Sequence, residues 1–256
     1  MKKLLTLIIL ISSFAQAQFY EIEYETHVSY INNEKGIEEL QKSQPSVSER
    51  NKIIEGNANP PKEYFTFIFN DKEANVNYVK KVNNGQGEIA RFIMIPPNLN
   101  TNYSYYDYEK GTYLEERDMY GRKFILENNF KPLEFKDSGN TKTILGYTAK
   151  ESIYTKDNLK ITVWYVPDFK KNYNLDVYTG VNGLVLEELI NETFEKGERI
   201  VKINAQKIKE IKKAKIVKPT KGEKVTNKEY TDILRETNRK RDELYEQSQG
   251  NGIDKK

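Results

Sequence analysis

Apolar and acidic side chains alternate at the start of the chain, beyond a short hydrophobic N-terminal run. Apolar residues at positions 20, 22 and 24 are separated by Glu21, Glu23 and Glu25. A two-residue period of this kind is typical of a strand with one buried face and one face in water. The pattern therefore predicts a half-buried strand over residues 20–30, with three carboxylates in a row on its outer face.

The same period recurs through most of the chain and is interrupted by turn signals. Lys110-Gly111 and Asn83-Asn84-Gly85 suit tight turns, and Pro96-Pro97 ends a strand. Further strands are expected at residues 62–70, 73–82, 89–95, 103–109, 112–118, 122–127, 133–135, 143–155, 159–166, 184–192 and 199–208. Residues 32–61 are polar and are interpreted mainly as a long loop, with room for a short helix near 37–40.

About ten to twelve strands at spacings near ten residues, with no helical period between them, favour an antiparallel sheet over an α/β fold. The fold class that we expect is mainly β, with a strongly curved antiparallel sheet or open barrel and a C-terminal α-helix. Residues 18–211 would form the β-rich domain. Residues 212–256 would form a basic linker and the helix.

The C-terminal region changes from a two-residue to a helical period. Thr226 and Glu229 have the spacing of a capping box, and apolar side chains follow at 230, 233, 234, 244 and 245. A helix is therefore predicted over residues 227–247. Residues 201–256 hold 16 basic and 9 acidic residues, whereas residues 18–200 hold 23 basic and 29 acidic residues. The basic run at 207–218 is interpreted as a solvated strand or linker, not as a nucleic-acid site.

The first 17 residues have the features of an export signal. Lys2 and Lys3 precede an apolar run at 4–11, and Ala15-Gln16-Ala17 suits signal-peptidase cleavage after Ala17. No second long apolar run occurs, so no transmembrane segment is expected in the mature chain. We expect a periplasmic protein, with association at the outer membrane as one variant of that location.

The composition limits the chemistry. The chain has no Cys and one His, His27, which excludes disulfides, thiol nucleophiles and Cys-ligated metals and disfavours triads based on His. Glu21, Glu23 and Glu25 have a spacing of about 7 Å on a strand, which a glycosidase pair could use. Asp107, Glu109, Glu115, Glu116 and Asp118 could face one another and bind a cation. An ordinary solvated face is the simpler interpretation of both sets, so no catalytic residue, metal ligand or cofactor is assigned.

Three blocks carry a family resemblance. They read ILGYTAKE at 144–151, ITVWYVPD at 161–168 and GVNGLVLE at 180–187. In this order they resemble the motifs of the GLPGLI family, exported bacterial proteins of unknown function, and the likeness covers about residues 103–211. The chain departs from the signature where Asn182 replaces Pro, Val181 replaces Leu and Val185 replaces Ile. Ala149 stands where the family often has Cys.

The resemblance marks a set of positions with a structural or binding role. These are Gly146, Tyr147, Trp164, Tyr165, Pro167, Gly180, Asn182, Gly183, Leu184, Leu186 and Glu187. Read from the residues alone, Gly180 and Gly183 bracket a turn in which Asn182 tolerates a positive φ. Trp164 is expected to be packed, and Pro167 ends its strand.

The function that we expect first is a non-enzymatic envelope protein that binds a protein partner, for example as an accessory of an outer-membrane complex. Its evidence is the export signal, the lack of catalytic groups and the charged helix with an apolar stripe. The alternative is a carrier for a lipid or small hydrophobic ligand in the concave face of the sheet. A carboxylate-dependent hydrolase is the least favoured hypothesis.

Overall fold

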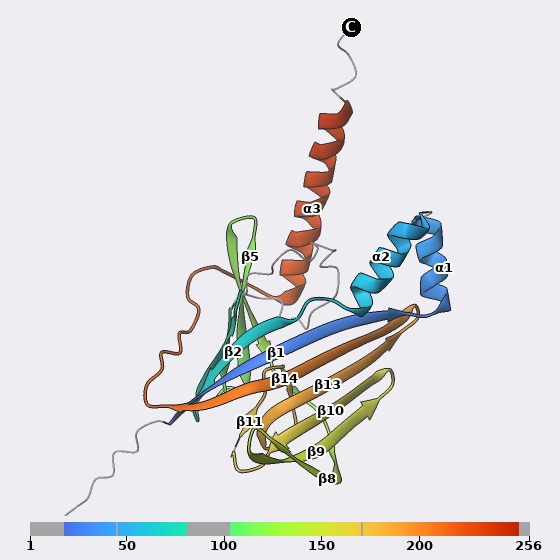
Figure 1. The fold of residues 1–256 in the computed structure, drawn as a ribbon. Helices are drawn as coiled ribbons and strands as arrows, with labels where there is room; N and C mark the ends of the chain where they lie inside the picture. The colour runs from blue at the N-terminus through green and yellow to red at the C-terminus, as the bar shows by residue number, and fades with distance from the viewer. Residues whose placement is uncertain (1–17, 45, 81–102, 170, 251–256) are drawn as a thin grey trace, which may run out of the picture.

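A computed structural model describes residues 18–44, 46–80, 103–169 and 171–250, with side chains up to residue 244. The predicted export signal at 1–17 and the predicted strand at 89–95 lie outside the described residues. The described chain is mostly β, and the strands form one large open, curved sheet followed by a long C-terminal helix (Figure 1). The predicted fold class is confirmed.

The elements have the following bounds in chain order. They are β1 (Phe19–Asn32), α1 (Glu34–Ser43), α2 (Val47–Ala58), β2 (Glu63–Phe69), β3 (Glu73–Tyr78), β4 (Tyr103–Asp107), β5 (Thr112–Met119), β6 (Arg122–Asn129), β7 (Lys131–Pro132), β8 (Lys136–Ile144), β9 (Tyr147–Lys156), β10 (Leu159–Val166), β11 (Asn172–Tyr173), β12 (Tyr178–Thr179), β13 (Gly183–Phe194), β14 (Gly197–Ile211), β15 (Glu223–Val225) and α3 (Asn227–Gly250). None of the described helices is both long and apolar enough to cross a bilayer.

The strands pair in the order β15-β6-β5-β4-β3-β2-β1-β14-β13-β10-β9-β8. Long strands in the middle, β1, β14 and β13, carry the curvature that brings the two ends of the sheet round a common interior (Figure 1). Most pairs are antiparallel, as expected. Three short pairs are parallel: β15 with β6, β11 with β13, and β12 with β7.

Residues 171–182, which we call the inner segment, lie in the interior of this sheet. Leu175 is fully buried, and its carbonyl accepts a hydrogen bond from the hydroxyl of Tyr106 on β4. The ring of Tyr173 stacks on Phe69 of β2 at 4.2 Å between centroids. The inner segment therefore joins the two halves of the sheet and fills the space between them with side chains.

The C-terminal segment covers the other end of the sheet. Residues 212–226, which we call the strap, cross one face of β4–β6, where Ile216 packs near Leu114 and Ile125. The strap ends as β15 along the edge of β6, so part of the predicted linker is a strand. Helix α3 then packs on the opposite face of β6.

An apolar cluster anchors α3. Tyr230, Ile233 and Leu234 contact Met119, Phe124 and Leu126, and the ring of Tyr230 meets that of Phe124 edge-on at 5.4 Å. The predicted capping box is present. The Glu229 carboxylate accepts from the Thr226 backbone N–H at 2.8 Å, and the Glu229 N–H donates to the Thr226 hydroxyl at 3.2 Å. The apolar stripe predicted for this helix is therefore used in part within the chain itself.

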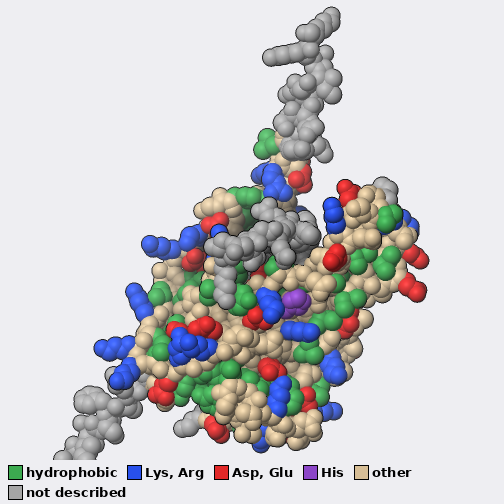
Figure 2. Space-filling model, viewed as in Figure 1, with side chains coloured by type: hydrophobic (Ala, Val, Ile, Leu, Met, Phe, Trp, Pro, Cys, Tyr) green, Lys and Arg blue, Asp and Glu red, His purple; other side chains and the backbone are tan. Residues whose placement is uncertain are grey.

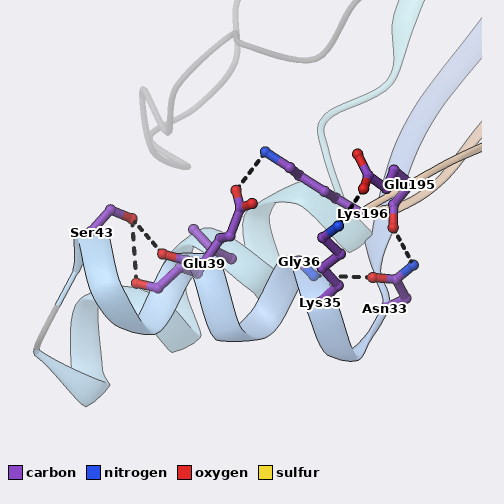
Figure 3. Close-up of polar contacts among 8 residues, drawn as sticks. Asn33, Lys35, Gly36, Glu39, Ser43, Glu195 and Lys196 are labelled. Atoms are coloured by element: carbon purple, nitrogen blue, oxygen red, sulfur yellow. Dashed lines mark hydrogen bonds and ion pairs between the residues drawn. The ribbon is translucent and has the colours of Figure 1, made fainter.

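The prediction of a long loop at 32–61 is wrong, because this stretch forms α1 and α2. The side chain of Asn33 caps the first turn of α1, and that of Ser46 caps the first turn of α2. Figure 3 shows α1 held against the turn between β13 and β14 by ion pairs of Lys35 with Glu195 and of Glu39 with Lys196. Gly36 allows this approach, because a Cβ there would lie 2.2 Å from the carbonyl oxygen of Lys196.

Two strand predictions in the middle of the chain also needed correction. The stretch 143–155 is interrupted by a turn at Leu145-Gly146, where both residues have positive φ, so it belongs to β8 and β9. Residues 133–135 form no strand. Strand β8 is almost wholly polar and exposed, as an edge strand can be, and therefore carries no two-residue period.

Candidate functional site

The outer glutamates of β1 lie in ion pairs with lysines. Lys209 on β14 lies 3.0 Å from Glu21 and 3.4 Å from Glu23, and Lys62 lies 2.8 Å from Glu25. Figure 2 shows acidic and basic side chains intermixed over this face of the sheet. The glutamates form a surface ladder of ion pairs, with the small energetic value of such pairs. They do not converge across a cleft.

The carboxylates of residues 107–118, which the sequence suggests as a cation site, do not converge on one point either. Glu115 is buried and pairs with Arg117, whereas Glu116 lies on the opposite face of β5 and pairs with Lys123 at 3.0 Å. Asp107 and Asp118 accept backbone N–H groups in their own turns, and Glu109 is exposed. In the part of the chain that the structure describes, no three His, Cys, Asp or Glu side chains group to hold a metal.

The second and third motif blocks meet on neighbouring strands. Trp164 on β10 pairs with Glu187 on β13, and Lys142 on β8 joins them. The Lys142 ammonium lies 4.2 Å from the centroid of the Trp164 ring and forms an ion pair with Glu187. This arrangement combines a cation–π contact with a partly exposed ion pair. Gly146, with φ of +86°, forms the hairpin turn before Tyr147.

The glycines of the third motif block lie against backbone. A Cβ on Gly180 would stand 2.1 Å from the carbonyl oxygen of Leu133, and one on Gly183 would stand 2.5 Å from that of Val166. Asn182 is exposed and is not among the residues with positive φ, so the expectation for its backbone is not met. Of the remaining motif positions, Leu184 and Leu186 are fully buried, Tyr165 is half-buried and Pro167 is exposed.

The inner segment brings together two carboxyl groups that the sequence analysis did not identify. Asp176 belongs to the inner segment and Glu188 to β13, and each is 2% exposed. The Asn174 amide donates to Glu188 at 3.2 Å, and the Val177 N–H donates to Asp176. One oxygen of each carboxyl, Oδ2 of Asp176 and Oε1 of Glu188, has no hydrogen-bond partner among the described residues.

Burial and mutual repulsion favour the protonated forms of this pair. Burial raises the pKa of Asp176 to about 6, against the smaller opposing effects of the Val177 N–H, Lys131 and Arg199. Burial and the charge of Asp176 raise the pKa of Glu188 well above its usual range. Such a pair can hold a proton near neutral pH, as an acid catalyst must. At 2% exposure, however, neither carboxyl lies at a surface that a substrate reaches.

A cavity of about 450 Å³ lies at the other end of the molecule, between the strap and the sheet. Its apolar wall includes Leu114 and Ile125, which are buried on β5 and β6. Its charged wall includes Lys218 and Lys224 from the strap and Glu127 from β6. In the sequence, Lys218 stands out only as part of the basic run at 207–218, and no pattern singles out Lys224 or Glu127.

Comparison with known proteins gives a likeness of fold. No family model matches the sequence, and no curated protein matches it. A structure of PNGF-II in space group C2 superposes with a TM-score of 0.50 at 17% identity, over 85% of this chain and 33% of that chain. The same protein in space group P21 gives 0.48 at 18% identity over the same shares. The chain thus spans about a third of PNGF-II, and the likeness at this identity is one of fold alone.

Proposed function

We propose that this chain is an exported envelope protein of the GLPGLI type that its sequence resembles, and that it acts by binding a protein partner. The main support for the proposal is that α3 extends beyond the sheet. The helix leaves the body of the molecule and extends well beyond the sheet (Figure 1). Among the α3 side chains that the structure describes, that of Arg241 is the most distal one in contact with the β5–β6 hairpin: its guanidinium lies 5.6 Å from the Tyr120 ring centroid.

The exposed part of α3 continues the stripe that anchors it. Leu244 lies three residues after Arg241, at the next position of the helical period, and is 66% exposed. The charged pairs of Arg239 with Glu236 and Glu243 keep the outer side of this helix polar. Helices in water gain most of their stability from packing of one face, so a partner that covers Leu244 would stabilise this end of α3.

The arrangement of acidic groups supports binding over catalysis. The carboxylates of the outer face are held in ion pairs, and the interior pair is enclosed. The carrier alternative in its original form needs an open concave face, whereas the inner segment occupies that space with buried side chains such as Leu175 and Val177. A protein-binding role is therefore the function that the geometry supports best.

Site-specific photo-crosslinking tests the proposal in the cell that produces the protein. A photoreactive phenylalanine analogue at Leu244 should give a discrete crosslinked species. The same analogue at Val47 on α2, which is 61% exposed, serves as the matched control and should not give it. Crosslinks that are identical at both positions, or none at Leu244, would reject α3 as the interface. Recovery of a chain that begins at Gln18 in the periplasmic fraction tests the location.

A further inference from the structure

The strap and the sheet together build a binding site that is separate from the distal part of α3. Leu114 and Ile125 point to the same face of β5 and β6 as Tyr105, and the strap crosses over this face. The result is a cavity of about 450 Å³, within the range of about 300–1,000 Å³ of small-molecule sites. A cavity of this size suits a small organic ligand.

Three charged groups line this cavity without an ion-pair partner. No acidic side chain of the described residues lies within ion-pair distance of Lys218 or Lys224, and no basic one lies within that distance of Glu127. This contrasts with the outer face of β1, where each glutamate has a lysine. A fourth charged residue of the lining, Glu229, already caps the first turn of α3.

The three groups come from β6, from β15 at the end of the strap, and from the part of the strap before β15. Glu127 is paired with Leu114 across β5 and β6, so the carboxylate and the apolar wall lie side by side. Lys224 is paired with Ile125 across the parallel pair of β15 and β6, which places it on the same face at the sheet edge. Lys218 comes from the strap, with its ammonium 5.7 Å from the Tyr105 ring centroid. The site thus combines two cations, one anion and an apolar wall.

We propose that this cavity binds a short zwitterionic peptide with an apolar side chain. Lys218 and Lys224 would take its carboxylate, Glu127 would take its ammonium group, and Leu114 and Ile125 would contact the side chain. A simple anionic amphiphile suits the cavity less well, because it leaves Glu127 unpaired next to a second negative charge. The proposal does not depend on the partner interface at α3.

Isothermal titration of the full mature chain tests the ligand class, with Leu-Leu as the probe. Leu-Leu should bind with a Kd below about 1 mM. Its N-acetylated form and its C-terminal amide should each bind at least tenfold more weakly, since each lacks one charge. Octanoate, an anion with an apolar chain, should also bind at least tenfold more weakly. Absence of Leu-Leu binding, or tighter binding of octanoate, would overturn the proposal.

Substitutions at the cavity test which side chains bind the peptide. Lys224→Met and Glu127→Gln should each weaken Leu-Leu binding at least tenfold, whereas Lys221→Met, an exposed strap lysine outside the cavity lining, should leave it unchanged. The Glu127→Gln variant should lose the preference for Leu-Leu over its N-acetylated form, which a merely structural role for Glu127 would not change. Wild-type affinity in both variants, with unchanged discrimination, would overturn the assignment.

Discussion

Two segments with little regular structure each cross a face of the sheet, and they leave very different interfaces. The inner segment is buried at its centre: Leu175 has no surface in contact with water, and Asp176 and Glu188 are enclosed with it. The strap packs through Ile216 but leaves a cavity lined by charged groups that have no ion-pair partner in the described chain.

The difference separates a structural device from a binding device. In the interior, the carboxyl groups of Asp176 and Glu188 are removed from water in surroundings that favour their protonated forms, and they accept hydrogen bonds from the Val177 N–H and the Asn174 amide. Between the strap and β6, the exposed charged groups of Glu127, Lys218 and Lys224 lie beside an apolar wall, which is the composition of a ligand site. The acidic residues in the two places therefore have different roles.

The largest expected effect comes from truncating one apolar side chain in each segment. Leu175→Ala should lower the free energy of unfolding by about 3–4 kcal/mol, because it leaves a cavity in a close-packed interior. Ile216→Ala should lower it by only about 1 kcal/mol, because Ile216 is only partly buried against the small cluster of Tyr105, Leu114 and Ile125. Denaturant unfolding of both variants measures the difference. Equal losses would show that the two segments are packed alike.

The enclosed carboxyls predict a dependence of stability on pH. The pKa of Asp176 is raised in the folded state to about 6, whereas in the unfolded chain it is about 4. The contribution of the protonated Asp176 to the free energy of unfolding is therefore fully present below about pH 4 and is lost as the pH rises through about 6. Asp176→Asn removes this titration. Between pH 4 and 6.5 the free energy of unfolding of the wild type should therefore fall by about 1–3 kcal/mol more than that of the Asp176→Asn variant.

Chemical denaturation at several pH values checks this prediction. Glu188→Gln provides a second variant: it removes the Glu188 carboxyl, whose pKa burial and the charge of Asp176 raise well above its usual range, and so should weaken the pH dependence as well. Stability curves that run parallel in the wild type and in both variants would contradict the account of an enclosed acid pair.

Removing the side chain that caps the first turn of α3, at the end of the strap, should lower the stability of the protein. Thr226→Ala removes the hydroxyl that accepts the Glu229 N–H, at an expected cost of about 1 kcal/mol in unfolding free energy. The loss should be visible as a lower Tm. Lys228→Ala, an exposed change in the same turn, is the control and should change the Tm little. An unchanged Tm in Thr226→Ala would mean that the capping box does not hold the strap to α3.

The smallest effect is expected on the outer face. Lys209→Ala removes the partner of Glu21 and Glu23, and since these pairs are partly exposed it should lower the free energy of unfolding least of all the destabilising changes described above. The loss should shrink further in high salt. A cost as large as that of Leu175→Ala would show that the ladder on β1 is more than a solvated face.

The sequence predicts those parts of the fold that have a clear period. Strands such as β1 and β2 alternate apolar and polar positions, and the capping box locates the start of α3. The sequence indicates α1 only as a short helix near 37–40 and gives no sign of α2, because their caps, Asn33 and Ser46, lie in a polar stretch whose apolar residues are few. Strand β8 was missed because an exposed edge strand has no buried face to produce alternation.

The candidate sites were harder to predict, since each depends on chain segments that meet only in the folded protein. Asp176 and Glu188 are twelve residues apart and meet because the inner segment turns into the interior. The one available signal was the apolar pair Leu175 and Val177 on either side of Asp176. The cavity needs the strap to cross β5 and β6, and nothing local to Lys224 or Glu127 indicates that crossing.

Hydrogen exchange of the full mature chain, with and without Leu-Leu, tests most directly the claim that the C-terminal segment carries the binding site. The account predicts slower exchange of backbone amides in residues 216–226 when the peptide is present, and no change in residues 172–188. Protection of the inner segment, or of neither segment at saturating peptide, would contradict it.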